Sequence, residues 1–398
     1  MILYSYYPWD PRPRREAESL ARRGMEVDVI CLRKDKHVRV HDCINGVNVF
    51  QIPLYRRREG KLTYISQYAK FFLAAFTVAS FKAVKSRYDL VHVHNMPDFL
   101  VFSALMPRLR GARVVLDLHD PMPELFCSIF PGSGSALATW LKRVEKLSIA
   151  FADRVLTPNA AFAQLFCSRG CSPQKLDIVM NSPDPLVFKV TQTGPKLKSG
   201  SKIQKTIDLT YHGLIVERHG VDLAVCAVNE LQNRFPTLHL HIYGETTPTA
   251  LQIMEMVQRL QLTDRIHFYG AKPQCEIPAA ICASDLGIIP NRLNSFTAIN
   301  LPTRVFEYLS VKRPVIAPRT NGIQDYFKED ELIFFEPGNL PDLTAKIEWA
   351  LTHPTDVQAI LERGFKVYER HRWELEEEKF VRIVGSLVRN GAERQKPA

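Results

Sequence analysis

The segment "LPTRVFEYLSVKRPVIAPRTNGI", Leu301–Ile323, joins a helix pattern directly to an apolar strand pattern. We expect a helix over "PTRVFEYLSV", with Thr303 as its N-cap, and a strand over "RPVIA". A single acid, Glu307, lies in the first turns of this helix, and the preceding "NRLNSFTAIN" contains none. An acid there is favoured by the helix dipole, whereas the free amides at the same helix end suit an anion such as a diphosphate. Glu307 is therefore either a helix-stabilising acid or a ligand contact.

The same alternation of strand and helix extends outward from this unit over both halves of the chain. Strand patterns include "MILYSYYP", "EVDVICL", "YDLVHVHN", "ARVVLDLHD", "LTYHGLI" and "LHLHIYG", and the segments between them, such as "FLVFSALMPRLRG", read as helices. The polar stretch "KVTQTGPKLKSGSKIQK" interrupts the rhythm and is typical of a linker. The pattern predicts an α/β protein with two doubly wound domains, each a parallel sheet covered on both faces, with ligand in the cleft between them.

Composition limits the class of protein. The chain has 398 residues, of which 46% are hydrophobic, and it has no apolar run of the roughly 20 residues that a spanning helix needs. The opening "MILYSYYPW" does not resemble a signal peptide. The eight cysteines are scattered without zinc-site spacing, so we expect free thiols in a reducing compartment. These features favour a cytoplasmic protein.

The charge of the chain is concentrated in its first half. Residues 1–200 hold 29 Lys and Arg against 17 Asp and Glu, a net +12, and residues 201–398 hold 23 against 25, a net −2, which together give the +10 of the whole chain. A basic half suits phosphates, nucleic acid or an anionic membrane. The aromatic-rich "AKFFLAAFTVASFKAVK" is either a membrane-surface helix or a core helix. No nucleic-acid-binding motif accompanies the charge, so no nucleic-acid partner is expected.

Two further stretches place polar residues at predicted strand ends. His119 and Asp120 follow the strand in "LDLHDPMPELF", where open α/β sheets place ligand contacts, although a structural histidine would look the same. In "YHGLIVERHGVDLAV", Gly213 ends a strand and Arg218 lies in the loop before the next helix. A cation there suits a diphosphate, and the alternative is a solvated charge cluster. No GxGxxG follows the first strand, and neither a P-loop nor a GxSxG occurs in the chain.

Taken together, these stretches resemble glycosyltransferase family 4, the retaining enzymes of the GT-B fold that use nucleotide sugars. The resemblance rests on the order and spacing of "SYYPWDPRPRREAESLARRGMEVDVI", "VVLDLHD", "YHGLIVERHGVDLAV", "FYGAKPQCEIPAAICASDLGIIP" and the segment quoted first. It implies an N-terminal acceptor domain (1–190), a linker (191–206), a C-terminal donor domain (207–372) and a final helix (373–398) that crosses back to the N-terminal domain.

The resemblance also implies roles for individual residues. Glu307 matches the second glutamate of the E-x7-E motif and would hold the nucleotide ribose, and His119 would lie beside the donor sugar as a catalytic residue. Arg218, also assigned to catalysis, would stabilise the departing diphosphate. Further donor-side contacts are expected from Gly213, from Lys272 at the base, and from backbone amides at Ile299, Asn300 and Leu301. Acceptor-side contacts are expected from Asp10, Arg12, Arg14 and Asp120.

Three positions depart from the family pattern. The first glutamate of E-x7-E is replaced by Ile299, a frequent arginine after the first glycine by Leu214, and a frequent lysine before the second glycine by His219. The resemblance implies transfer of a sugar, and since the chain lacks an Asp-x-Asp near a strand end, no metal or other cofactor is expected. The basic first half suits an acceptor that is lipid-linked or carries phosphate, with the protein peripheral on the inner membrane face. A GT-B nucleotide-sugar epimerase and a non-catalytic, membrane-associated binding protein on this fold are the alternatives.

Overall fold

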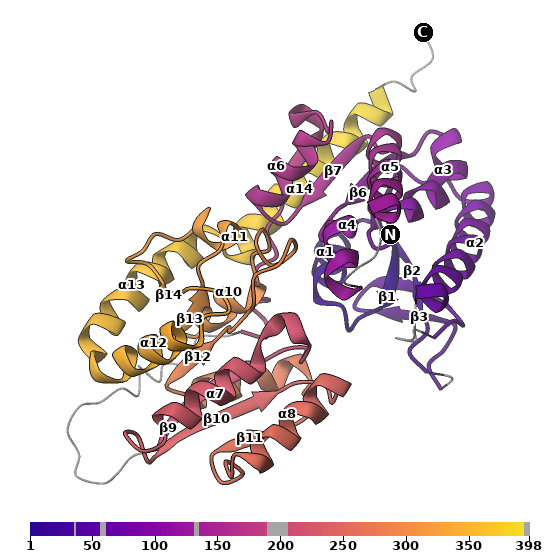
Figure 1. The fold of residues 1–398 in the computed structure, drawn as a ribbon. Helices are drawn as coiled ribbons and strands as arrows, with labels where there is room; N and C mark the ends of the chain where they lie inside the picture. Colours follow the sequence, from indigo (N-terminus) through magenta and orange to yellow (C-terminus); the bar gives the residue numbers. More distant parts are fainter. Residues whose placement is uncertain (36, 56–60, 131–134, 189–205, 394–398) are drawn as a thin grey trace. The chain divides into compact units, whose positions relative to one another are not determined.

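A computed structural model describes residues 1–35, 37–55, 61–130, 135–188 and 206–393 of the chain. These residues form two compact units (Figure 1). Unit 1 comprises Met1–Asn181 together with Glu374–Ala398, and unit 2 comprises Ser182–Trp373. Except for Thr206, the predicted linker 191–206 lies outside the described residues.

Unit 1 contains an eight-stranded sheet in the order β3-β4-β2-β1-β5-β6-β7-β8, parallel except that β3 runs antiparallel to β4. Its strands are β1 (Ile2–Tyr6), β2 (Val27–Leu32), β3 (His41–Ile44), β4 (Val47–Ile52), β5 (Leu90–His94), β6 (Arg113–Asp117), β7 (Arg154–Thr157) and β8 (Leu176–Ile178). Its helices, with η for a 3-10 helix, are α1 (Pro11–Arg22), α2 (Lys61–Lys85), η1 (Asp98–Ala104), α3 (Leu105–Leu109), α4 (Met122–Ile129), α5 (Ser135–Phe151), α6 (Ala160–Ser168), η2 (Pro173–Lys175) and α14 (Trp373–Glu393).

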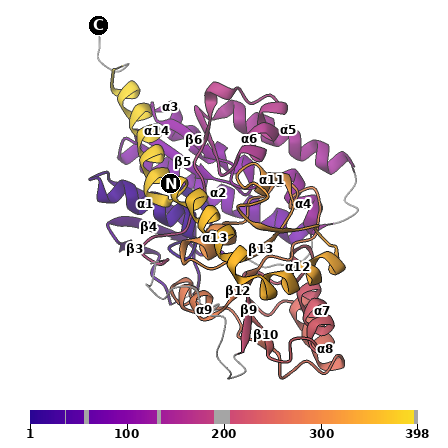
Figure 2. The same cartoon turned by 90° about the vertical axis from the view of Figure 1, so that its left-hand side faces the viewer.

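The last helix, α14, contributes to the core of unit 1. Phe380 is completely buried in a cluster that includes Leu3 of β1 and Val29 of β2. Glu377 at the start of α14 accepts hydrogen bonds from Arg22 and Arg23 at the end of α1, and the two helices lie beside each other in Figure 2. The C-terminal helix therefore belongs to the first unit.

Helix α2 combines the two alternatives drawn from its sequence. One stripe, which includes Phe71 and Ala75, is fully buried against unit 1. The opposite side carries four large apolar side chains that are each more than half exposed: Ile65, Leu73, Phe81 and Val84. The helix is thus a core helix on one face and an apolar surface on the other.

The prediction of one helix over "FLVFSALMPRLRG" is wrong about the type of helix in its first half. The segment starts with the 3-10 helix η1 and becomes α-helical only at Leu105. Pro107 has no backbone N–H to donate into the preceding turn, which disfavours an α-helical ladder upstream of it. The upstream residues instead close shorter turns, as in the bond from the Leu100 amide to the Pro97 carbonyl at 3.0 Å.

Unit 2 contains a six-stranded sheet in the order β11-β10-β9-β12-β13-β14, with all described pairs parallel. Its strands are β9 (Ile207–His212), β10 (Leu238–Tyr243), β11 (Ile266–Phe268), β12 (Leu286–Ile288), β13 (Val315–Pro318) and β14 (Ile333–Phe335). Its helices are η3 (Glu217–His219), α7 (Val221–Leu231), α8 (Pro248–Arg259), η4 (Gln274–Glu276), α9 (Ile277–Ala283), α10 (Thr303–Ser310), α11 (Asn321–Gln324), α12 (Leu340–Thr352) and α13 (Pro354–Arg370).

Helix α10 is held tightly against the sheet of unit 2. The Tyr308 hydroxyl donates to the Thr210 carbonyl at 2.6 Å, and a Cβ on Gly287 of β12 would lie 2.5 Å from the Tyr308 ring. The N-cap of α10 is Pro302 in an extended conformation, so Thr303 is the first helical residue and the predicted N-cap is wrong by one position. This packing fixes which face of α10 reaches the carboxyl edge of the sheet.

Candidate functional site

The carboxyl edge of unit 2 is marked by a row of glycines. Gly213, Gly244 and Gly270 follow β9, β10 and β11, and the amides of Gly213 and Gly244 donate to the Tyr243 and Gly270 carbonyls. A Cβ on Gly244 would lie 2.3 Å from the Gly213 carbonyl oxygen, and Gly213 has φ of +126°. Side chains are therefore excluded here, and a ligand can approach the backbone closely.

Arg304 on the first turn of α10 brings a cation to this edge. Its Nη1 donates to the His212 carbonyl at 3.0 Å and its Nη2 to Asn291 Oδ1 at 3.4 Å. The guanidinium lies over the Tyr211 ring, 4.9 Å from its centroid, and Nη1 is 3.3 Å from where a Cβ of Gly213 would be. Arg304 was not predicted from the sequence, although a basic residue one turn before Glu307 was a visible signal.

Arg218, the cation predicted from the sequence, lies in η3 near the same strand end. Burial, together with the positive charges of Arg304 and Arg218, lowers the pKa of the neighbouring His219 to about 3, against the hydrogen bond to the Leu214 carbonyl, which raises it. The neutral His219 ring donates through Nδ1 to the Leu214 carbonyl at 2.6 Å. His219 therefore supplies no charge in place of the family's lysine, and the cations of this edge are Arg218 and Arg304.

Glu307 lies one helical turn after Arg304, on the same side of α10. Its Oε2 is 3.5 Å from Nε2 of His212, and the two side chains are 13% and 7% exposed. Burial lowers the pKa of His212 to about 3, with a further contribution from Arg304, so the ring is neutral at pH 7. A half-enclosed carboxylate beside the glycine row is a suitable acceptor for sugar hydroxyls, and the ribose contact stays a prediction.

The backbone amides of Ile299 and Asn300 are among the predicted donor contacts. Both donate to the Phe296 carbonyl, at 3.2 and 3.0 Å, so these amides are engaged within the protein, and their contact with phosphate or sugar stays a prediction. The turn that they form packs its carbonyls against α11, where a Cβ on Gly322 would lie 2.4 Å from the Ile299 oxygen. The contact of the Leu301 amide with the donor stays a prediction.

Lys272, the predicted base contact, lies two residues after Gly270 in the loop that follows β11. Its ammonium pairs with Glu276 at 3.5 Å, and the two side chains are 38% and 53% exposed. The structure thus places Lys272 near the end of the glycine row, in a solvent-exposed ion pair. Its contact with a nucleotide base stays a prediction.

In unit 1, His119 follows β6 at the carboxyl edge of the sheet. The side-chain oxygen of Asn95 accepts from the amides of His119 and Asp120 at 3.1 and 3.4 Å, which fixes the loop. The imidazole is one quarter exposed, with Nδ1 3.9 Å from Oδ2 of the buried Asp117. The ring is thus held at the strand end where it was expected, and its catalytic role stays a prediction.

Arg12 does not have its predicted role in binding the acceptor, because it is buried. Only 3% of the residue is exposed, and Nε and Nη2 donate to the two carboxylate oxygens of Asp117 at 2.6 and 3.0 Å. Nη1 donates to the Val179 carbonyl at 2.9 Å. Burial raises the pKa of Asp117, but Arg12 and His94 outweigh it and hold that pKa well below its ordinary value. Arg12 is therefore a structural cation.

The other predicted acceptor residues lie at or near the same edge of unit 1. Asp10 occupies the N-cap position of α1, Arg14 lies one turn later, and Asp120 follows His119. All three are partly exposed, unlike Arg12. Their contact with an acceptor stays a prediction.

A buried cluster next to Arg12 was missed entirely. Glu16 of α1, His92 and His94 of β5, and Asp117 of β6 bring their polar atoms together in the interior of unit 1. The sequence signal for it was the alternation in "VHVH", which places both histidines on one face of a strand.

Comparison with known proteins defines the class. Among solved structures, sucrose-phosphate synthase from Thermosynechococcus elongatus matches with a TM-score of 0.76 at 17% identity, covering 97% of this chain and 98% of that one. HepE of Anabaena, solved in complex with UDP-glucose, matches with a TM-score of 0.69 at 14% identity, covering 97% and 99%. With two parallel-sheet α/β units, the protein has the GT-B fold, which confirms the predicted fold class.

Two family models then match the chain one after the other. "Glycosyl transferase 4-like domain" matches residues 11–182, and "Glycosyl transferases group 1" matches residues 206–353. The chain belongs to this family of glycosyltransferases, as its sequence resemblance implied.

Curated relatives are distant. One component of the human phosphatidylinositol N-acetylglucosaminyltransferase is 20% identical over 81% of this chain, and the match spans 61% of the human protein. The D-inositol 3-phosphate glycosyltransferase of Segniliparus rotundus is 23% identical over 77% of this chain and 68% of its own length. Among the described residues, no helix is long and apolar enough to cross a membrane.

Proposed function

We propose that this protein transfers a sugar from a nucleoside-diphosphate sugar to an acceptor, with retention of configuration at the anomeric carbon. The observation that carries the proposal is that Arg304 and Glu307, one turn apart on α10, both lie beside the glycine row at the edge of unit 2. A cation and open backbone suit a diphosphate, and a carboxylate one turn away suits the ribose hydroxyls. The Anabaena protein with the same fold was solved with UDP-glucose, which supports this donor class.

The transfer mechanism follows from where charge develops. Departure of the diphosphate builds negative charge, and Arg304 and Arg218, both near the end of β9, would stabilise it without a metal ion. The family resemblance assigns His119 to the donor sugar, where it would orient the ring. Attack of the acceptor on the same face that the diphosphate leaves needs no protein nucleophile.

The donor assignment is tested with nucleotides and nucleotide sugars. We expect a panel of nucleoside-diphosphate sugars, incubated with and without membrane extract, to release nucleoside diphosphate only when acceptor is present. Glu307→Gln should weaken nucleotide binding about 10- to 100-fold, because a hydrogen bond to a charged group contributes roughly 1.5–3 kcal/mol. Glu255→Gln, an exposed acid on α8, is the matched control and should bind as the parent does.

The same experiment separates the alternatives. Conversion of the donor without any acceptor would identify an epimerase instead. If calorimetry and thermal-shift measurements detect no binding of any nucleotide, the protein is a non-catalytic binding protein and the proposal fails.

For the acceptor, we propose a lipid-linked or phosphate-bearing glycan presented at the inner face of a membrane. The exposed apolar side of α2 adjoins α3, where Leu109 is 71% exposed, and Lys85 lies 4.3 Å over the Phe81 ring. Apolar side chains flanked by basic residues suit an anionic membrane surface. A relative in Bacillus subtilis is named for teichuronic acid biosynthesis, which supports a polysaccharide product.

Membrane binding is tested by sedimentation with vesicles containing anionic lipid at low salt. The protein should sediment with these vesicles, and Leu73→Ser combined with Phe81→Ser should release it. Leu251→Ser, which changes an exposed leucine on α8 of unit 2, is the control and should sediment with the vesicles as the parent does. A parent protein that stays in the supernatant at low salt would overturn this part of the proposal.

A further inference from the structure

Four titratable side chains are enclosed together in the interior of unit 1. Glu16 and Asp117 are 0% exposed, and His92 and His94 are each 1% exposed. One potential ligand atom from each of the four lies within 4.8 Å of all the others. Ionisable side chains are rarely buried to this extent unless they are paired or bind a metal.

We propose that Glu16, His92 and His94 bind a divalent cation of the zinc class inside unit 1. Oε2 of Glu16 lies 3.5 Å from Nε2 of His94 and 3.8 Å from Nδ1 of His92. Tetrahedral bonds of about 2.0–2.1 Å separate neighbouring ligand atoms by about 3.4 Å. The two distances to Glu16 are close to this value, and the ligand atoms of the two histidines lie within 4.8 Å of each other. Two imidazoles and a carboxylate are a ligand set that zinc accepts, and the second oxygen of Glu16 or a water would complete four-fold coordination.

Asp117 has the position of an orienting residue for this site. Its Oδ2 is 3.0 Å from Nδ1 of His94, on the other side of the ring from the nitrogen that approaches Glu16. Metal-binding histidines commonly present their second nitrogen to a carboxylate in this manner. Arg12 donates two hydrogen bonds to Asp117, so the charge of its guanidinium is balanced by that carboxylate. Nε of Arg12 also lies 3.6 Å from Oε1 of Glu16.

The polar atoms that would bind the metal lack hydrogen-bond partners within the described part of the protein. Both carboxylate oxygens of Glu16 and both ring nitrogens of His92 are buried and have no hydrogen-bond partner in the described structure. An unsatisfied buried polar group costs about 1–3 kcal/mol, so a cluster of this kind requires a compensating interaction. A bound cation would provide that interaction for the Glu16 carboxylate and for one ring nitrogen of His92.

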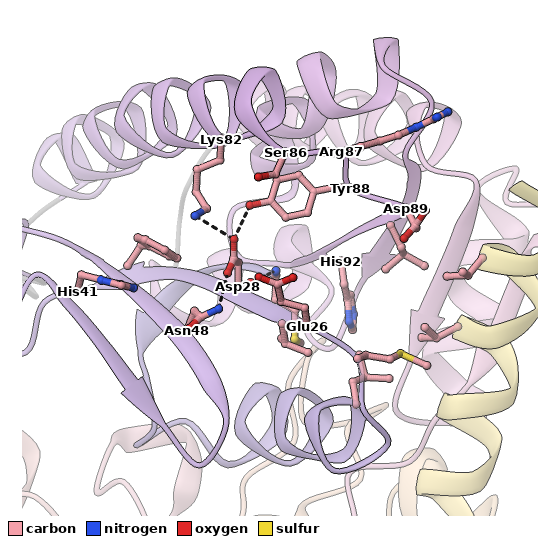
Figure 3. Close-up of a pocket in the computed structure, with 18 residues that line it drawn as sticks. Glu26, Asp28, His41, Asn48, Lys82, Ser86, Arg87, Tyr88, Asp89 and His92 are labelled. Carbon is pink, nitrogen blue, oxygen red and sulfur yellow. Dashed lines mark hydrogen bonds and ion pairs between the residues drawn. The ribbon is translucent and has the colours of Figure 1, made fainter. Parts of the chain in front are cut away.

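A pocket lies next to the cluster. A cavity of about 470 Å³ opens in unit 1 between α2 and the beginnings of β2 and β5. Its polar rim is formed by Asp28, which accepts from Tyr88 and Asn48 and pairs with Lys82, and His92 lies on its wall (Figure 3). His92 is the member of the cluster that forms part of the pocket wall, and its ring nitrogens are buried behind that wall.

The decisive experiment measures metal content and coordination in the full-length protein. The parent, loaded with ZnCl₂ and desalted, should retain one Zn²⁺ per chain by plasma mass spectrometry, and Co²⁺ should give the intense visible bands of four-coordinate sites. Glu16→Gln, which keeps the shape of the side chain, should weaken Zn²⁺ binding by about 100-fold or more, beyond the usual effect of changing an orienting residue. Zn²⁺ should raise the melting temperature of the parent but not of Glu16→Gln.

A surface cluster provides the control that makes the result specific. His239 and His267 in unit 2 are partly exposed, and their ring nitrogens lie 3.3 Å apart, so they could bind added metal weakly. The variant with both changed to asparagine should keep the tight Zn²⁺ ion. Circular dichroism must show Glu16→Gln folded, and His92→Gln provides a second variant if it is not.

The proposal is overturned by either of two results. In the first, the parent retains no metal, and the buried groups of the cluster would then be satisfied by sharing a proton. Alternatively, the tight ion is lost from the His239 and His267 variant and kept by Glu16→Gln and His92→Gln.

Discussion

The two sheets of the molecule carry different chemistry at their carboxyl edges. In unit 1, Arg12 and Asp117 at the end of β6 are buried and hydrogen-bonded to each other. In unit 2, glycines follow the strands β9 to β11, and Arg304 lies beside them, donating to the His212 carbonyl and to Asn291. The charges of Arg12 and Asp117 are matched within unit 1, whereas the edge of unit 2 combines accessible backbone with positive charge, as anion binding requires.

The largest effect is expected from breaking the internal pair of unit 1. Arg12→Met leaves the Asp117 carboxylate buried without its guanidinium, which should reduce the free energy of unfolding by about 3–5 kcal/mol. Urea denaturation at pH 7 measures this loss. The control is Arg319→Met in unit 2, whose pairs with Glu329 and Glu336 are solvent-exposed and should contribute about 0–1 kcal/mol.

Equal effects of the two substitutions would contradict the contrast between the units. They would mean that burial of the Arg12 pair adds nothing to its importance. A further variant, Arg12→Met with Asp117→Leu, separates the cost of an unpaired charge from the cost of lost packing, because it removes both charges together.

The second effect concerns catalysis at the edge of unit 2. If Arg304 stabilises the departing diphosphate, Arg304→Met should lower kcat by about 100- to 1,000-fold, the usual effect of removing one preorganised donor. Arg218→Met should have a smaller effect, because it leaves the guanidinium beside Gly213 in place. Arg259→Met, an exposed cation at the end of α8, is the control.

The measurement is initial rates over a range of donor concentration, combined with calorimetry of the nucleoside diphosphate alone. A loss confined to donor affinity, with kcat unchanged, would show that Arg304 contributes only to ground-state binding. A larger loss for Arg218→Met than for Arg304→Met would restore the prediction made from sequence and refute the structural preference for Arg304.

Much of the fold was predictable from sequence because its signals are local. Alternating strand and helix patterns predicted two doubly wound domains, and the GT-B fold confirms them. The error in the helix after β5 arose because a continuous apolar pattern concealed the effect of Pro107 on the hydrogen bonds upstream. The positions of Gly213 and Glu307 were recognisable for the same local reason, since each lies within one strand–helix motif.

The remainder of the site depends on contacts between distant parts of the chain. Arg12 was taken for an acceptor contact because Asp117, its partner, is 105 residues away in the sequence. The cluster of Glu16 with His92 and His94 likewise requires the packing of α1 over β5. Arg304 lies within a recognised motif, but the direction of its guanidinium is set by the packing of α10 on β9, which no spacing rule gives.

The smallest effect concerns the neutral histidines at the edge of unit 2. Burial, together with the Arg304 charge, lowers the pKa of His212 from 6.5 to about 3. Between these values the unfolded chain binds a proton that the folded protein does not, so stability falls as pH drops below 6.5. The slope from this residue is about 1.4 kcal/mol per pH unit. His212→Asn removes this proton, so the difference in unfolding free energy between pH 6.5 and 5.5 should shrink by about 1 kcal/mol, because at pH 6.5 only about half of the unfolded molecules carry the proton.

Urea midpoints at the two pH values measure this change. The dependence is reduced and not abolished, because burial also lowers the pKa of His219 in unit 2 and of His92 in unit 1. His353→Asn, at the exposed end of α12, is the control and should leave the pH dependence of the parent intact. An unchanged dependence in His212→Asn would mean that His212 is already protonated in the folded protein. It would then form an ion pair, as an imidazolium, with Glu307 3.5 Å away. The edge of unit 2 would in that case contain an internal ion pair, like that of Arg12 with Asp117 in unit 1.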